Sequence, residues 1–269
     1  MSTFHPKVHR NEFLLQLLSD KSGRISPRGR SSTKHAMIIL NSESTISSKA
    51  LIQKTWSQCD IRICADGGAN RLYDLFGNDV EFLPDQIKGD LDSIKPSVSE
   101  FYKSHGVKVL LDEAQDSNDL DKCMQSVLEL CSPAGCLATN VLIIGAYGGR
   151  FDQEMAAIQA LFKWDTYFHR IVLLGRPSIS FLLSPGSHRI EPLEMEKQPG
   201  NYCGLIPLNG PCRRITTTGL GWDLNNHELA FGNLISTSNF IKPDVDTVEI
   251  DTSDYVLWTS SFDFNANCI

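Results

Sequence analysis

The sequence predicts an α/β protein with two successive parts. Between residues 36 and 176, short apolar runs alternate with amphipathic helical patterns, which is typical of a mostly parallel, Rossmann-like sheet with flanking helices. Between residues 177 and 269, turn signals separate short β-prone runs and the helical pattern is absent, which predicts an antiparallel β-sandwich. We therefore expect two domains that meet near Arg176 and Pro177.

The elements follow from hydrophobic periodicity. Continuous apolar runs indicate strands that are buried on both faces, whereas spacings of three and four residues indicate helices with one apolar face. The expected strands of the first part are 37–40, 61–65, 106–111, 141–144 and 171–174. The expected helices are 44–56, 70–76, 120–128 and 152–164. In the second part, runs at 179–183, 214–218 and 255–259 indicate strands.

Composition excludes several classes of protein. The chain has 269 residues, 41% hydrophobic and 21% charged, with a net charge of -7 that argues against a general nucleic-acid binder. No apolar run is long enough to span a membrane, and no apolar segment behind the N-terminus indicates a secretory signal. The eight cysteines show no C-x-x-C spacing, so we expect a reduced, cytoplasmic protein.

Residues 1–35 are rich in Lys, Arg, Ser and His. We expect an N-terminal tail that is either mobile or a short packing arm. A mitochondrial transit peptide is the alternative, but Glu12 and Asp20 are unfavourable for one.

The most informative stretch runs from Ile63 to Ser93. Asp66, Asp90 and Asp92 each follow a short strand-like run beside glycines, and carboxylates in that setting suit Mg²⁺ that carries phosphates. Glycines such as Gly67 and Gly68 let a polyphosphate approach the backbone closely. This stretch predicts a metal–nucleotide site.

Two further motifs fall at strand ends, where ligands bind in open α/β sheets. Asp116 and Asp119 open the predicted helix at 120–128, where Asp116 could equally be a helix cap, and Lys122 could contact a phosphate or pair with Asp119. The segment 148–152 combines exposed backbone N–H groups, the fork of Arg150 and a helix N-terminus, which favours phosphate binding. Asp152 could cap that helix or help to hold metal and substrate.

Other phosphate and metal motifs are absent from the sequence. It contains no G-x-x-x-x-G-K-[ST] and no G-x-G-x-x-G, and the acidic segment 112–121 lacks the central Gly and final Glu of a calcium loop. Asp90 and Asp92 could suggest an aspartyl-phosphate phosphatase, but Lys88 and Gly89 do not read as the hydrophobic strand such an enzyme needs.

One loop of the second part combines Trp222 with Gly219 and Gly221. Tryptophan is usually a core residue, but a Gly-rich loop is a poor place for a core anchor, and an exposed Trp suits stacking on a flat cationic ligand. Ser236 and Ser238 either hydrogen-bond a ligand or alternate on a strand face.

Together these segments resemble the eukaryotic type of the thiamine pyrophosphokinase family. The resemblance covers about residues 36–262 and is carried by ADGGANRLYD, GDLDS, D-x-x-D-x-x-K, GGRFDQ, TTTGLGWDL and LISTSN. Asn118 stands where that family commonly has Thr, which removes no charged group. The resemblance implies an ATP-dependent transfer of a pyrophosphoryl group to thiamine, and a homodimer whose active sites are shared between subunits.

The resemblance also assigns roles to residues. It implies a magnesium site, catalytic groups, contacts to ATP and contacts to thiamine. The Mg²⁺ ligands would be Asp66, Asp90 and Asp92, and the catalytic groups would be these three with Asp119 and Arg150. Contacts to the nucleotide would come from Gly67, Gly68, Asn70, Arg71, Asp116, Lys122, Gly149 and Asp152. Contacts to thiamine would come from Trp222, Gln86, Ser236 and Ser238.

Two other functions use the same residues. One is a Mg-dependent sugar-phosphate or nucleotide hydrolase, and the other is a non-catalytic sensor of thiamine or nucleotide. Acidic residues at all five predicted positions disfavour the sensor.

Overall fold

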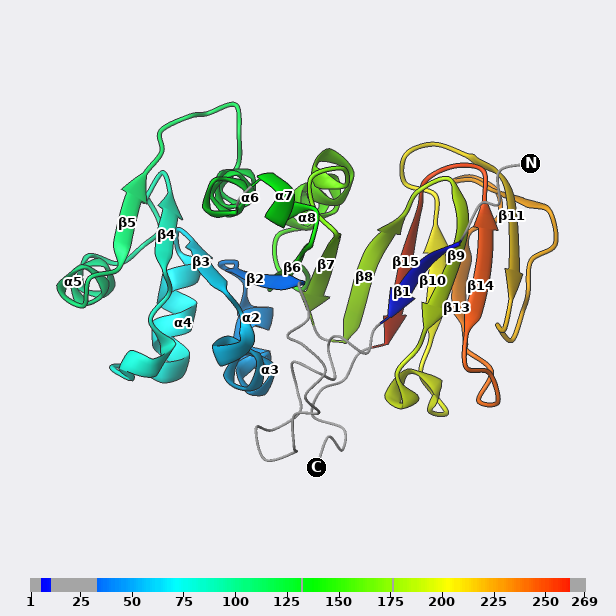
Figure 1. The fold of residues 1–269 in the computed structure, drawn as a ribbon, viewed down its shortest axis with the longest axis horizontal. Coiled ribbons are helices and arrows are strands. Elements are labelled where there is room, and N and C mark those ends of the chain that lie inside the picture. Colours follow the sequence, from blue (N-terminus) through cyan, green and yellow to red (C-terminus); the bar gives the residue numbers. More distant parts are fainter. Residues whose placement is uncertain (1–5, 11–32, 132, 176, 262–269) are drawn as a thin grey trace. The chain divides into compact units, whose positions relative to one another are not determined.

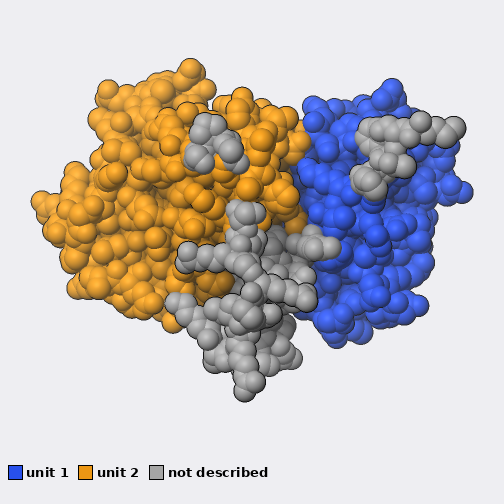
Figure 2. Space-filling model, in the orientation of Figure 1, with its two compact units in different colours: residues 1–18, 177–263 blue, residues 19–176, 264–269 orange. Residues whose placement is uncertain are grey.

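The computed structural model describes residues 6–10, 33–131, 133–175 and 177–261. The chain divides into two compact units, residues 19–176 with 264–269 and residues 1–18 with 177–263, which are coloured separately in Figure 2. It is a mixed α/β protein.

The first unit is built on a parallel sheet. Its strands lie in the order β7-β6-β2-β3-β4-β5, and every neighbouring pair is parallel (Figure 1). The strands are β2 (Lys34–Ile39), β3 (Ile61–Ala65), β4 (Gln86–Gly89), β5 (Lys108–Leu111), β6 (Thr139–Ile144) and β7 (Arg170–Gly175). All residues of β6 are buried, as expected for a strand with both faces covered.

Helices connect these strands. They are α2 (Glu43–Ser47), α3 (Lys49–Thr55), α4 (Gly68–Phe76), α5 (Pro96–Ser104), α6 (Asp119–Leu130), α7 (Pro133–Cys136) and α8 (Phe151–Trp164), with short 3-10 turns η1 (Trp56–Gln58) and η2 (Val80–Phe82). The helix predicted over 44–56 is divided at Ser48 into α2 and α3. None of the described helices has the length and apolar character needed to cross a bilayer.

The second unit consists of two sheets of mostly antiparallel strands. Its strands are β1 (Lys7–Arg10), β8 (Ser178–Leu183), β9 (Gly186–Glu191), β10 (Cys203–Ile206), β11 (Cys212–Thr218), β12 (His227–Leu229), β13 (Ser236–Asn239), β14 (Val248–Thr252) and β15 (Val256–Ser261), with a 3-10 turn η3 (Glu194–Lys197). One sheet has the order β1-β9-β14-β11-β12, and the strands β13, β10, β15 and β8 are neighbours in that order in the other. Buried side chains from both sheets, including Phe181, Leu205, Ile215 and Ile250, form one core.

Two features of the fold differ from the prediction. Lys7–Arg10 form strand β1, which pairs in parallel with β9, so part of the predicted tail belongs to a sheet. Strand β4 was not among the expected strands, and it includes Lys88 and Gly89, which do not read as a hydrophobic strand, and ends directly before Asp90. The apolar patch at 13–18 and its acidic neighbours Glu12 and Asp20 lie outside the described residues.

Candidate active site

A pocket of about 420 Å³ lies at the carboxyl ends of the parallel strands. Segments after β2, β3, β4 and β6 reach it, together with the N-terminal turns of α6 and α8. This is the edge of an open parallel sheet at which ligands bind. Of the predicted site residues, those that line the pocket are Asp66, Gly67, Asp90, Asp92, Asp119, Lys122, Gly149 and Arg150.

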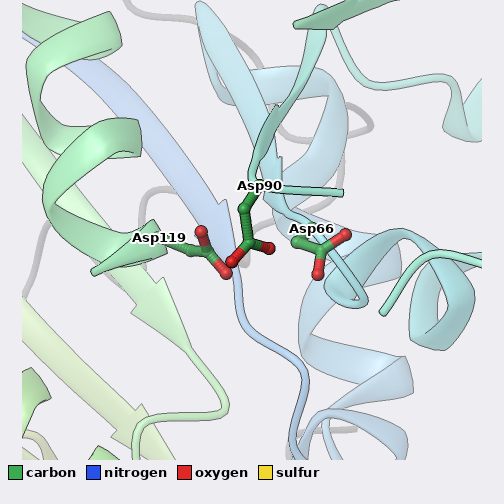
Figure 3. Close-up of side chains that lie close together, drawn as sticks. All are labelled: Asp66, Asp90 and Asp119. Atoms are coloured by element: carbon green, nitrogen blue, oxygen red, sulfur yellow. The ribbon is translucent and has the colours of Figure 1, made fainter. Parts of the chain in front are cut away.

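Three carboxylates meet in this pocket. One oxygen from each of Asp66, Asp90 and Asp119 lies within 4.8 Å of the others, although the residues come from three separate strand or helix ends (Figure 3). Clustered carboxylate oxygens are a ligand set that suits Mg²⁺, which fills its remaining positions with water and phosphate oxygens. The cluster therefore contains Asp119, whereas the sequence predicts Asp92 as the third ligand.

Asp66 is fixed by the backbone of the loop after β4. Its carboxylate accepts hydrogen bonds from the N–H groups of Ser93 (3.0 Å) and Ile94 (3.1 Å). Its φ of +40° is one that residues other than glycine rarely adopt, so the turn after β3 is strained where it presents the carboxylate. Burial raises the pKa of Asp66, and the nearby charge of Asp92 raises it further, against the effect of the hydrogen bonds.

Asp119 is the first residue of α6. Burial raises its pKa above the ordinary value, and the charges of Asp90 and Asp66 raise it further, whereas Lys122 acts in the opposite direction. Repulsion among three carboxylates is the electrostatic condition that a bound divalent cation relieves. This donor set therefore fits a magnesium ion.

Gly89 makes the close approach of these carboxylates possible. A Cβ atom at this position would lie 2.7 Å from the Cβ of Asp66 and 2.8 Å from Oδ1 of Asp119. Any side chain at residue 89 would therefore push the two acids apart.

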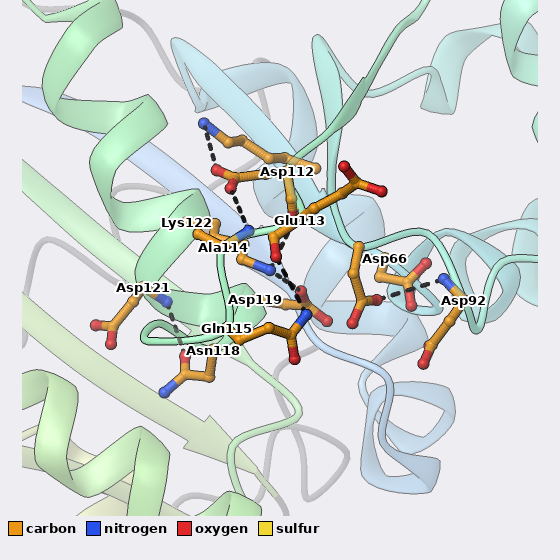
Figure 4. Close-up of polar contacts among 12 residues, drawn as sticks. Asp66, Asp92, Asp112, Glu113, Ala114, Gln115, Asn118, Asp119, Asp121 and Lys122 are labelled. Atoms are coloured by element: carbon orange, nitrogen blue, oxygen red, sulfur yellow. Dashed lines mark hydrogen bonds and ion pairs between the residues drawn. The ribbon is translucent and has the colours of Figure 1, made fainter.

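Lys122 is buried behind the cluster. Its Nζ donates to the backbone oxygen of Asp112 (2.8 Å) and lies 3.6 Å from Oδ1 of Asp119 (Figure 4). Of the two sequence interpretations, the pairing with Asp119 is thus the one present in the structure. Asn118, not Asp116, caps α6 by accepting from the N–H of Asp121 (2.9 Å). Asp116 is exposed and does not line the pocket.

Arg150 lies at the mouth of the pocket and precedes α8. Its side chain is 74% exposed and is paired with Asp152, which is therefore engaged by Arg150 and does not cap the helix. The backbone N–H groups of Gly148 and Gly149, predicted to bind phosphate, donate to a carboxylate oxygen of Glu154 at 2.8 and 3.2 Å.

Several predicted nucleotide contacts have packing roles. A Cβ atom on Gly68 would lie 2.2 Å from the backbone oxygen of Ile39, so this glycine lets α4 approach β2. The side chain of Asn70 donates to the oxygen of Ser93 and accepts from the N–H of Lys95, both at 2.9 Å, which braces the loop after β4.

Arg71 and Gln86 do not line the pocket either. Arg71 donates to the side chain of Asn41 (3.0 Å), and Asn41 does line the pocket. Gln86 begins β4, at the end of the strand opposite Asp90, and is buried. Its prediction as a thiamine contact rested on nearness in sequence to the acidic loop, and the geometry of β4 separates the two.

Trp222 is exposed in the second unit, as its Gly-rich loop predicts. The residue is 64% exposed, and its ring meets the ring of Phe240 edge-on, with the two ring centroids 5.4 Å apart. The side chain of Asn239 holds its backbone, accepting from its N–H (3.1 Å) and donating to its oxygen (2.9 Å). Ser236 is buried whereas Ser238 is exposed with a φ of +56°, so the two serines do not share a strand face.

Some residues that line the pocket were not predicted from the sequence. Asn41 and Ser42 follow β2, and Glu154 lies in the first turn of α8. For Asn41 and Ser42 the available signal was their position, because polar residues directly after a buried strand face the same edge of the sheet as Asp66.

Comparison with known proteins places both units. The family model of the thiamin pyrophosphokinase catalytic domain matches residues 52–173, and that of the thiamin pyrophosphokinase vitamin B1 binding domain matches residues 187–257. Thiamine pyrophosphokinase 1 of Arabidopsis thaliana is 39% identical over 97% of this chain and 95% of its own. The chain belongs to the thiamin pyrophosphokinase family.

Other members of the thiamin pyrophosphokinase family agree in extent and fold. Thiamine pyrophosphokinase 1 of Oryza sativa subsp. japonica is 37% identical and covers 95% of this chain and 98% of its own. The solved structure of thiamin pyrophosphokinase from Candida albicans has a TM-score of 0.78 at 25% identity and covers 98% of this chain and 95% of its own. The three clustered carboxylates lie within the part that matches the catalytic domain of the thiamin pyrophosphokinase family.

Proposed function

We propose that this chain transfers the pyrophosphoryl group of ATP to the hydroxyethyl oxygen of thiamine, giving thiamine diphosphate and AMP. The observation that carries the proposal is the cluster of Asp66, Asp90 and Asp119 in a pocket within the part matched by the catalytic family model. ATP is the expected co-substrate, since metal-bound phosphates suit both the carboxylates and the adjoining helix N-termini.

In the proposed reaction the hydroxyl oxygen of thiamine forms a bond to the β-phosphorus of ATP. The bond from that phosphorus to the α,β-bridging oxygen breaks, AMP leaves with the electron pair, and the hydroxyl proton is released. Mg²⁺, when bound, would neutralise phosphate charge during this exchange. Asp66, Asp90 and Asp119 would hold it.

The chain's own groups would position the phosphates. Arg150 is exposed at the mouth and would exchange part of its contact with Asp152 for a phosphate oxygen. Lys122 would act mainly through Asp119, because its ammonium is buried and already bonded to the oxygen of Asp112. Asp92 also lines the pocket and remains a proposed catalytic residue.

The second unit would bind thiamine. Trp222 is exposed beside Phe240, and its ring face can stack on the positively charged thiazolium ring of thiamine. The match of this unit to the vitamin B1 binding domain supports that assignment. Exposed Ser238 is the better of the two proposed serine contacts, since Ser236 is buried.

We further propose a homodimer in which Trp222 of the partner subunit completes the site. The family resemblance implies this arrangement, and the exposure of Trp222, Phe231 and Phe240 is compatible with contacts to a second chain. A cytoplasmic location is supported by the seven described cysteines, which are all free and buried. We propose the finer fold description as well, a Rossmann-like domain before residue 177 and a β-sandwich after it.

The deciding experiment incubates the purified chain with ATP, Mg²⁺ and thiamine and measures AMP and thiamine diphosphate. We expect both products in equal amounts, and neither without Mg²⁺. Free phosphate without thiamine diphosphate would support the hydrolase instead. Binding of thiamine or nucleotide without turnover would support the sensor.

A further inference from the structure

The side chain of Glu154 binds the first two backbone N–H groups of the segment 148–152, which is predicted to bind phosphate. One of its carboxylate oxygens accepts from the N–H of Gly148 (2.8 Å) and from the N–H of Gly149 (3.2 Å). It lies one turn into α8, and it lines the same pocket as the three clustered carboxylates. A carboxylate that accepts from two amides makes charge-assisted hydrogen bonds, which are the stronger kind.

The loop before α8 depends on such contacts. Gly148 has a φ of +81°, and the hydroxyl of Ser42 donates to the backbone oxygen of Tyr147 (3.3 Å) on the β2 side of the loop. Glu154 holds the opposite end, at the two residues directly before Arg150. The backbone that presents Arg150 is therefore fixed from both sides, whereas the Arg150 side chain is itself mostly exposed.

We infer that Glu154 is a positioning residue that holds this loop so that Arg150 meets the phosphates of the nucleotide. This inference rests on the proposed function, because it assigns the pocket to ATP. In the opposite role, the Glu154 carboxylate would compete with the nucleotide, because it accepts from backbone N–H groups that a phosphate would otherwise bind. The two roles predict changes of opposite sign when the carboxylate is removed.

The experiment compares Glu154→Ala, Glu154→Gln and the wild type. We expect Glu154→Ala to weaken binding of Mg²⁺ with a non-hydrolysable ATP analogue about tenfold and to lower kcat/KM for ATP by a similar factor, since a small misplacement of a positioning group is costly. The KM for thiamine should change less than twofold. Glu154→Gln should restore most of the loss, because its amide oxygen can accept from the same N–H groups.

Glu129→Gln is the matched control, since Glu129 lies near the far end of α6 and its variant removes one negative charge away from the pocket. It should behave as wild type. Tighter nucleotide binding in both Glu154 variants would overturn the inference in favour of competition. Unchanged nucleotide binding in Glu154→Ala would also overturn the inference. So would a lowered Tm together with equal losses of kcat/KM for ATP and for thiamine. Because binding is measured directly, it tests the inference even if the wild type makes no thiamine diphosphate, which would contradict the proposed function alone.

Discussion

Charge repulsion sets the character of the site at the scale of single residues. The pKa of Asp119 is raised by burial and by Asp90 and Asp66, so its ionised form is disfavoured in the folded chain. For a carboxylate with a raised pKa, stability is highest at low pH and falls as pH rises through the folded-state pKa. At neutral pH and without metal, the cluster should therefore destabilise the fold.

We expect Asp119→Asn to raise the Tm of the metal-free chain by about 2 °C and to abolish the stabilisation that Mg²⁺ gives the wild type. Turnover should be lost as well, because a proposed metal ligand is removed. Thermal unfolding with and without Mg²⁺ measures both effects. Asp74→Asn, which changes an exposed carboxylate on α4, is the control and should leave the Mg²⁺ effect intact. A lower Tm without metal would contradict the repulsion argument.

Gly89 offers a steric test of the same cluster. Gly89→Ala should lower kcat by about 100-fold or more, because the added Cβ would collide with Asp66 and Asp119 and move their oxygens. Stability should fall by about 1–3 kcal/mol, as for other overpacked sites. Steady-state kinetics and chemical denaturation separate the two effects.

Gly210→Ala is the control for Gly89→Ala. Gly210 has a φ of +98°, and a Cβ added there would meet no atom within 4 Å, so alanine there should cost stability through backbone strain without changing kcat. Near-normal turnover in Gly89→Ala would show that the carboxylates need not approach so closely.

The sequence located these acids by motif, but it could not say which three converge. Asp66, Asp90 and Asp92 are close in sequence, yet Asp119 reaches the cluster because β5 and the loop after it return α6 to the same sheet edge. A packing distance of this kind depends on the three-dimensional path of the chain. The exposure of Trp222, in contrast, followed from local loop chemistry alone.

At the scale of elements, apolar periodicity predicted most of the parallel strands and the helices α4, α6 and α8. Apolar periodicity did not predict β4, α5 and β1, which lack a clear apolar pattern in the sequence. Strand β4 contains Lys88, whose ammonium is paired with Asp112 at 3.4 Å, so a charged residue is accommodated within a parallel strand. Helix α5 was missed although Pro96 occupies its first turn, a position that proline favours. Strand β1 depends on pairing with β9, which is far away in the sequence. The hydrogen bond between His9 and His188 joins positions that differ by 179 in residue number.

A hydrogen bond ties together the two helices that carry the site. The indole N–H of Trp164 on α8 donates to a carboxylate oxygen of Asp121 on α6 (2.8 Å), and Lys163 bonds to the other oxygen (3.0 Å). We expect Asp121→Ala to lower stability by about 1–3 kcal/mol, because it leaves the buried indole N–H without this partner. Chemical denaturation measures the loss.

Asp121→Asn should retain most of that stability, since its amide oxygen can still accept from Trp164. Lys163→Ala should cost at most about 1 kcal/mol, because it removes only a partly exposed ion pair. If Lys163→Ala were as costly as Asp121→Ala, the ion pair and not the indole bond would hold the helices.

At the scale of the whole molecule, each unit contains the match to one of the two domain models of the thiamin pyrophosphokinase family. The catalytic match contains the carboxylate cluster, and the vitamin B1 binding match contains Trp222. The first unit holds the carboxylate cluster proposed to bind metal and phosphate, and the second unit holds the exposed Trp222 beside Phe240. The proposed reaction therefore needs both units, and the proposed homodimer supplies them from two chains.

Mixing two impaired variants, assayed at a thiamine concentration far below the raised KM of Trp222→Ala, tests that arrangement. Asp90→Asn should abolish turnover through the metal site, whereas Trp222→Ala should raise the KM for thiamine far more than the KM for ATP. If each site combines the α/β unit of one subunit with the β unit of the other, a heterodimer of these variants has one site with both changes and one intact site. Subunit exchange between differently tagged variants should then restore activity, up to about one quarter of wild type at statistical mixing, because half of the dimers are mixed and each regains one of two sites. Native mass spectrometry verifies the exchange. If the exchange is complete, activity no higher than that of the unmixed variants would contradict the shared site.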